Sequence, residues 1–177
     1  MATENMCHAP APNTFDEGRF RTVLGTFCSG LTVVTGTTIT GEPVGFTCQA
    51  FASLSLAPPL VMICPSKASR TWPHLRATGR FCVNVLRRDQ EDLSHRFATM
   101  PADRFAGISW SHSVRGVPML DACLARVECE VQHEYDGGDH LIVVASVTDL
   151  QDNGGEPLVY FRGSYTGTQP VLGAGWR

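Results

Sequence analysis

Two long strand-like runs joined by a four-residue turn constrain the fold of this chain most strongly. The runs cover Leu124–Tyr135 and His140–Leu150, and Asp136-Gly137-Gly138-Asp139 separates them. Glycine tolerates positive φ, so this turn is a strong signal for an antiparallel hairpin. The sequence therefore predicts a long pair of antiparallel strands in the last third of the chain.

Shorter strand-like segments precede and follow this pair, with turn signals between them. Leu31–Ile39 is rich in Thr and Val, Thr40-Gly41-Glu42 follows it as a hairpin turn, and we expect Val44–Phe51 to return as its partner. Three more segments are predicted strands: Leu60–Cys64, Phe81–Leu86 and Leu158–Phe161. About seven strands with few helices predict a mainly β chain, folded as a closed or nearly closed antiparallel barrel.

The first predicted helix lies ahead of these strands. Thr14 followed by Glu17 has the pattern of a capping box, and Gly30 is a plausible stop. Between them, apolar residues repeat at i, i+3, i+4 and i+7, which is the spacing of one helix face. That face consists of Phe20, Val23, Leu24 and Phe27.

Two further short helices are expected in the middle of the chain. One spans about Ser69–Arg76, where Pro73 is tolerated only in the first turn. The other covers Asp89–Ala98. The Gly- and Pro-containing stretch from Pro101 to Asp121 is predicted to be a loop.

Length and charge limit the domain count and exclude some partners. A chain of 177 residues fits one domain, which we place at 13–168, between a disordered leader at 1–12 and a tail at 169–177. A net charge of −3 argues against nucleic acid as a partner. The longest run without a charged or strongly polar residue, Leu56–Cys64, is too short to cross a membrane, and no export signal is visible. We therefore expect a cytoplasmic protein.

The cysteines favour reduced thiols over a disulfide framework. There are seven, an odd count, and no CxxC pair or zinc-type spacing occurs. Cys48 or Cys64 with His74 or His140 would form a nucleophilic Cys–His pair. Both cysteines sit in apolar strands without a nucleophile motif, which favours inert buried thiols.

Two segments carry residues that suit a bound nucleotide. Gly45–Ser53 combines glycine with small and hydroxyl residues, so a flat ligand could approach the backbone, although composition alone favours an ordinary strand. Cys64–Thr71 places serines, a threonine, a lysine and an arginine where a helix begins. Such residues bind phosphate, but they also serve as a plain helix cap.

The hairpin turn itself is a third candidate. A metal site would use His133, Asp136, Asp139 and His140. The turn geometry already demands Asp and Gly there, so we expect no metal. His140 is either a surface histidine or a hydrogen-bond donor to a ligand across the barrel mouth.

Taken in order, these segments resemble the short-chain flavin reductases that serve two-component flavin-dependent monooxygenases. The resemblance runs from about Phe15 to Thr168. It rests on the order and spacing of FRTVLGTFCSGLTVVT, PVGFTCQAFASLSLAPPLVMICPSKASRTW, GRFCVNVL, RFA, DRFAGISW, DGGDHLIVV and PLVYFRGSYTG.

The resemblance implies a fold and an activity. The fold is the Greek-key split β-barrel of flavin reductase-like, FMN-binding proteins, assembled as a homodimer. The activity is reduction of free FAD or FMN, with FAD favoured, by NADH or alternatively NADPH. Reduced flavin then passes to a partner monooxygenase. Hydride transfer runs between the two cofactors, so no catalytic side chain is strictly required.

The resemblance also implies binding residues. Phe46, Thr47, Gln49 and Ala50 would line the isoalloxazine, with Cys48 and Ser53 as further cofactor-binding residues. The phosphate or pyrophosphate would be held by Cys64, Pro65, Ser66, Lys67, Ser69, Arg70 and Thr71. Arg96 and Phe97 would close over the flavin, and His140, Arg162 and Tyr165 would position the nicotinamide nucleotide.

Three alternative functions are compatible with the same barrel but do not include this reaction. The first is a non-catalytic dimeric module that binds or stores flavin. A second is a related split-barrel oxidase acting on a pyridoxal-type phosphate. The last is an interaction scaffold without a ligand. The DGGDH turn argues against storage, because a storage protein needs no nicotinamide site.

Overall fold

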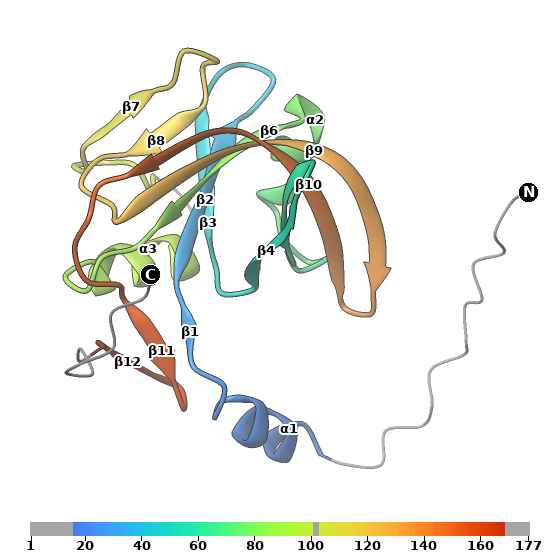
Figure 1. The fold of residues 1–177 in the computed structure, drawn as a ribbon, viewed down its shortest axis with the longest axis vertical. Helices are drawn as coiled ribbons and strands as arrows, with labels where there is room; N and C mark the ends of the chain where they lie inside the picture. The colour runs from blue at the N-terminus through green and yellow to red at the C-terminus, as the bar shows by residue number, and fades with distance from the viewer. Residues whose placement is uncertain (1–15, 101–102, 169–177) are drawn as a thin grey trace, which may run out of the picture.

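The computed structural model describes residues 16–100 and 103–168 (Figure 1). The predicted leader, the C-terminal tail and Thr14 lie outside these residues. Among the residues described, no helix is long and apolar enough to span a membrane.

Seven strands form one antiparallel sheet in the order β3-β2-β6-β9-β10-β5-β4. The sheet's two edge strands, β3 and β4, are neighbours in the sequence, and only Gln49 and Ala50 separate them. The sheet must therefore curl until its edges meet at this link, which makes a barrel that is split along one seam. The strands are β2 (Thr32–Thr37), β3 (Pro43–Cys48), β4 (Phe51–Leu56), β5 (Pro59–Ile63), β6 (Arg80–Val85), β9 (Ala125–Gly137) and β10 (His140–Asp152).

Short elements surround the barrel. The helices are α1 (Glu17–Leu24), α2 (Trp72–Thr78) and α3 (Glu91–Thr99). A three-stranded sheet contains β1 (Ser29–Gly30), β11 (Val159–Phe161) and β12 (Ser164–Thr166), and a separate hairpin contains β7 (Trp110–His112) and β8 (Pro118–Leu120). Figure 1 shows α1 projecting from the end of the molecule where β1 begins.

Two apolar clusters stabilise this arrangement. The first fills the barrel with alternate side chains from the strands, including the buried residues Ile63, Phe81 and Val143. The second lies outside the barrel wall and includes Phe97 of α3 and Leu120 of β8. Since successive strand residues point to opposite faces, the central strands are buried on both sides where α3 and the β7–β8 hairpin cover them.

The prediction of a mainly β barrel is confirmed, and so are most of its strands. The turn at Gly138 joins β9 and β10 as expected, with φ of 84° at that glycine. Pro73 stands in the first turn of α2. The third predicted helix is present as α3, displaced by one or two residues.

Three predictions about the first helix and the first hairpin were wrong. The first helix has Asp16 as its N-cap, whose carboxylate accepts a hydrogen bond from the Arg19 N–H at 2.7 Å, whereas the sequence pattern predicted a cap two residues earlier. It ends at Gly25, well before Gly30. The strand expected over Val44–Phe51 breaks at the β3–β4 link, because the chain changes there from one edge of the sheet to the other.

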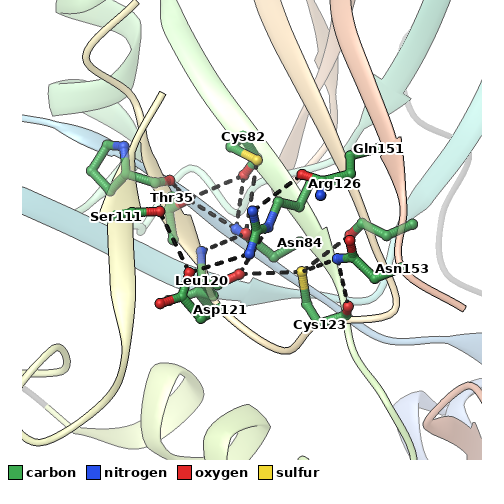
Figure 2. A network of polar contacts seen from close by, with 12 residues as sticks. Thr35, Cys82, Asn84, Ser111, Leu120, Asp121, Cys123, Arg126, Gln151 and Asn153 are labelled. Atoms are coloured by element: carbon green, nitrogen blue, oxygen red, sulfur yellow. Dashed lines mark hydrogen bonds and ion pairs between the residues drawn. The ribbon is translucent and has the colours of Figure 1, made fainter. Parts of the chain in front are cut away.

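The stretch from Pro101 to Asp121 was predicted as a loop but contains the β7–β8 hairpin. Its strands have three residues each, too few for a sequence pattern to show. Figure 2 shows what attaches this hairpin to the barrel. The fully buried Asn84 accepts a hydrogen bond from the Leu120 N–H at 2.9 Å and donates to the Val33 carbonyl at 2.9 Å. Thr35 donates from its hydroxyl to the Pro118 carbonyl.

We predict that Asn84→Ala destabilises the protein by about 3 kcal/mol, because it leaves buried backbone groups on β2 and β8 without partners. Urea unfolding monitored by circular dichroism measures this loss. The matched control is Gln132→Ala, which removes an exposed amide that bonds Ser146 Oγ at 2.9 Å and should change stability by less than about 0.5 kcal/mol. Equal unfolding midpoints for the two variants would show that the Asn84 network does not stabilise the fold.

Candidate functional site

A hollow of about 810 Å³ opens beside the seam of the barrel. Its volume lies in the range of about 300–1,000 Å³ that is typical of small-molecule sites. Three segments identified in the sequence converge on it: the end of β3 with the β3–β4 link, the loop between β5 and α2, and the β9–β10 turn. The predicted residues that line it are Phe46, Thr47, Cys48, Gln49, Ala50, Cys64, Pro65, Ser66, Ser69, Arg70, Thr71, Phe97 and His140.

The wall formed by β3 depends on a close approach of α3. A Cβ atom placed on Gly45 would lie 2.9 Å from both the Phe97 ring and the Val34 carbonyl oxygen, so any larger residue would push α3 away. Thr47 donates from its hydroxyl to the Ser94 carbonyl of α3 at 2.6 Å. These contacts hold Phe97 at the hollow, where sequence reasoning expected it.

The loop between β5 and α2 is attached to the β9–β10 turn. The Lys67 N–H donates to the Asp139 carbonyl at 2.9 Å, and the Leu141 N–H donates to the Pro65 carbonyl at 2.9 Å. The Lys67 ammonium pairs with the Asp136 carboxylate at 2.6 Å, and its hydrogen bond lowers the pKa of Asp136. Lys67 is therefore directed to the turn, away from the hollow.

Two guanidinium groups supply positive charge at one end of the hollow. Arg70 and Arg104 both line it, and neither forms an ion pair with a carboxylate among the described residues. Arg104 is held in place, since it donates to the Gly45 carbonyl, to Thr71 Oγ1 at 3.2 Å and to the Met100 carbonyl at 2.6 Å. Burial and the nearby charge of Arg70 lower the pKa of Arg104. This end of the hollow suits an anion such as phosphate.

Arg104 is the functional candidate that sequence reasoning missed. It lies within DRFAGISW, a segment already noted for its resemblance. No local pattern could show that its side chain turns back across β3 to reach the hollow.

His140 lies at the start of β10, where it forms an isolated β-bridge with Ser66 of the loop between β5 and α2. Its Nδ1 contacts the Asp139 carboxylate at 2.7 Å, and this hydrogen bond lowers the pKa of Asp139. The contact fixes the orientation of the ring. Nε2 makes no hydrogen bond to a described residue, so it is the ring nitrogen that a ligand in the hollow can reach.

Five predicted site residues do not line the hollow: Ser53, Lys67, Arg96, Arg162 and Tyr165. Arg96 donates to the Ala106 carbonyl at 2.6 Å and faces a different depression. Arg96 directly precedes Phe97 on α3, and adjacent helix residues do not share a face. Tyr165 donates to Ser94 Oγ at 3.3 Å, and the Arg162 guanidinium lies 5.3 Å from the centre of the Phe161 ring.

The thiols in the site have the character of inert groups. Burial raises the pKa of Cys48 to about 11 and also raises the pKa of Cys64. A nucleophilic cysteine requires a lowered pKa, so the interpretation as unreactive thiols agrees with this environment. Within residues 16–100 and 103–168, no cluster of three or more His, Cys, Asp or Glu side chains is placed to hold a metal ion.

Comparison with known proteins shows which family this chain belongs to. Residues 24–169 match the family model described as flavin reductase like domain. The chain is 46% identical over 172 residues to the reductase subunit of a flavin-dependent monooxygenase from Rhodococcus jostii, covering 96% of this chain and 88% of that one. It is 40% identical over 162 residues to the reductase component of a 4-nitrophenol 4-monooxygenase/4-nitrocatechol 2-monooxygenase from Rhodococcus opacus, covering 92% and 86%.

Solved structures of related reductases have the same fold. A nitrilotriacetate monooxygenase component B homolog from Mycobacterium thermoresistibile superposes with a TM-score of 0.86 at 47% identity, covering 92% of this chain and 93% of that one. An NADH:FAD oxidoreductase from Streptomyces globisporus, in complex with NAD and FAD fragments, gives 0.83 at 33% identity, covering 89% and 95%.

Proposed function

Because the chain belongs to the flavin reductase-like domain family, it is an oxidoreductase that reduces flavin for a monooxygenase, and we propose that NADH or NADPH supplies the hydride. FAD or FMN is the acceptor, and reduced flavin leaves for the partner enzyme. The observation that carries this proposal is the convergence of three elements on one open hollow. They are the β3–β4 link, the loop between β5 and α2 with the guanidinium groups of Arg70 and Arg104, and His140.

The β3–β4 link is suited to the isoalloxazine. Gln49 and Ala50 lie outside the ladders of both edge strands, so the sheet does not use their N–H groups. Such donors stabilise the negative charge that gathers on the pyrimidine edge of a reduced flavin. Phe46 and Phe97 give the ring system apolar walls. The bound flavin itself supplies the hydride-accepting chemistry.

The phosphate of the flavin belongs at the end of the hollow formed by the loop between β5 and α2. There, Ser66, Ser69 and Thr71 offer hydroxyl groups beside Arg70. In this proposal Arg104 faces the hollow and contacts the phosphate together with Arg70. Arg96, which the resemblance implied would close over the flavin, does not line the hollow. Lys67 acts indirectly, by holding the loop against the β9–β10 turn. These residues bind and orient the flavin without taking part in a proton transfer.

His140 positions the nicotinamide. With Nδ1 engaged by Asp139, the ring presents Nε2 to a ligand lying over the flavin site. Hydride transfer requires the reacting atoms of the two rings at about 3–3.5 Å, and no general acid or base is needed. The relative from Streptomyces globisporus, an NADH:FAD oxidoreductase, supports the choice of a nicotinamide donor. A storage module would have no use for this histidine.

We also propose that a second copy of the chain covers α1. No residue of α1 is buried, and Val23 and Phe27 are 55% and 78% exposed. An apolar face of this kind on the surface of a single chain marks an interaction site. Leu24 and Phe27 also line the hollow, so a homodimer formed here would place the flavin beside the interface.

We predict that the purified protein oxidises NADH in air only when FAD or FMN is added, with a rate that saturates in flavin. Loss of absorbance at 340 nm measures this reaction. A protein that binds flavin but leaves both NADH and NADPH untouched would be a storage module, and the proposed reaction would be wrong.

We predict that His140→Ala raises the KM for NADH about five- to tenfold, the value of one hydrogen bond, and lowers kcat less. Steady-state kinetics with saturating flavin separate the two constants. The matched control is His133→Ala, an exposed histidine on β9 that does not line the hollow. Unchanged kinetics in His140→Ala would remove the role assigned to this residue.

We predict that Val23→Asp converts a dimer into monomers, since it places a charge at the proposed interface. Light scattering coupled to size-exclusion chromatography measures the mass. Ile39→Asp is the control, because Ile39 is 82% exposed in the β2–β3 turn and away from α1. The interface proposal fails if both variants keep the mass of the unaltered protein.

A further inference from the structure

Glu134 of β9 lies on the inner face of the barrel, where a carboxylate is costly. Its cross-strand partner is Val143 of β10, which is fully buried in the barrel core. Cross-strand partners share one face of a sheet, so the Glu134 side chain faces the same interior, and only 22% of it is exposed. An apolar residue would fill such a place at a lower cost in desolvation. The carboxylate therefore indicates a task for Glu134 besides stabilising the barrel.

Both oxygens of the Glu134 carboxylate contact α2. Oε1 accepts a hydrogen bond from the Trp72 indole N–H at 2.9 Å, and Oε2 lies 3.5 Å from a guanidinium nitrogen of Arg76. Trp72 and Arg76 are four residues apart, so they share one face of the helix. The Trp72 contact is the stronger of the two, because Trp72 is 2% exposed, whereas the Arg76 side chain is 59% exposed and solvent screens its ion pair.

Trp72 is the first residue of α2 and directly follows the loop between β5 and α2. Ser69 Oγ accepts hydrogen bonds from the N–H of Trp72 at 3.1 Å and from the N–H of Thr71 at 3.3 Å. The first half of this loop is attached to the β9–β10 turn by its two backbone hydrogen bonds. In the part of the chain that the structure describes, residues 68–71 make no hydrogen bond to β9 or β10. The second half of the loop is therefore attached to this hairpin through Trp72.

We propose that Glu134 is a positioning residue for the phosphate of the flavin, and that it acts through Trp72. The inference rests on the proposed function and adds to it a residue that does not line the hollow. By holding the indole, Glu134 fixes the start of α2, and with it the hydroxyl groups of Ser69 and Thr71. Groups that are held in place before the ligand arrives bind it more tightly, since less ordering is needed on binding.

This arrangement separates two parts of the flavin site. The walls proposed for the isoalloxazine come from β3, the β3–β4 link and α3, whereas Glu134 bonds to α2. Riboflavin has the same isoalloxazine as FMN but lacks the phosphate. A comparison of these two ligands therefore distinguishes an effect on the phosphate from an effect on the whole site.

The test measures the Kd of FMN and of riboflavin by equilibrium dialysis with the full-length chain. Trp72→Phe keeps an aromatic ring in the core but removes the indole N–H. Glu134→Ala removes the carboxylate, and Glu134→Gln keeps an acceptor for the indole while losing the charge that pairs with Arg76. The matched control is Glu130→Ala, which removes another carboxylate of β9. Glu130 is bonded to Arg115 at 2.7 Å and does not line the hollow.

We expect Trp72→Phe and Glu134→Ala to raise the Kd of FMN about five- to tenfold, the value of one hydrogen bond, and to change that of riboflavin less than about twofold. Glu134→Gln should bind FMN within about twofold of the unaltered protein, because the exposed ion pair contributes little. Trp72→Phe combined with Glu134→Ala should weaken FMN binding no more than either change alone, since both remove the same hydrogen bond. Glu130→Ala should leave both Kd values unchanged.

Equal changes in the Kd of FMN and of riboflavin would overturn the inference, because Glu134 would then support the site as a whole. The inference would also fail if Glu134→Gln bound FMN as weakly as Glu134→Ala, or if Trp72→Phe bound FMN as tightly as the unaltered protein. Each of these results leaves flavin reduction intact. Failure of the proposed function looks different, because the unaltered protein would then bind FMN but oxidise neither NADH nor NADPH.

Discussion

The structure depends on one constraint. The two edge strands of the main sheet, β3 and β4, are joined by only two residues. Gln49 and Ala50 must carry the chain from β3 to β4, so the sheet has to close on itself at that point. Open sheet edges normally invite unwanted pairing with other chains. Here the edges are brought together without a ladder between them, and the hollow proposed to hold the flavin opens beside the resulting seam.

The site owes its shape to backbone contacts more than to ion pairs. Exposed pairs such as Lys67–Asp136 contribute little stability, on the order of 1 kcal/mol or less. The two hydrogen bonds that tie residues 65–67 to residues 139–141 run between backbone groups, so they do not depend on ionisation. Gly45 adds the other requirement, because α3 and Phe97 approach β3 only where no side chain intervenes.

Much of this could be read from the sequence, and the failures have physical causes. The β9–β10 turn was predictable because Gly138 has a conformation that other residues avoid. The break at Gln49 was not, since neither it nor Ala50 is a turn residue and only the closure of the barrel demands the change of direction. Arg96 and Arg104 show a similar limit. Both lie near α3 and have the same chemistry, but tertiary packing alone decides which guanidinium reaches the site.

In the proposed homodimer, helix α1 would connect assembly to ligand affinity. It has eight residues, fewer than the roughly 12–15 that an isolated helix needs to be stable in water, and none of them is buried within one chain. Leu24 and Phe27 nevertheless form part of the wall of the hollow proposed to hold the flavin. With a second copy covering α1, separation of the two chains would loosen that wall together with the interface. Flavin affinity would then depend on protein concentration, and a dilute solution of the reductase would release its flavin more readily than a concentrated one.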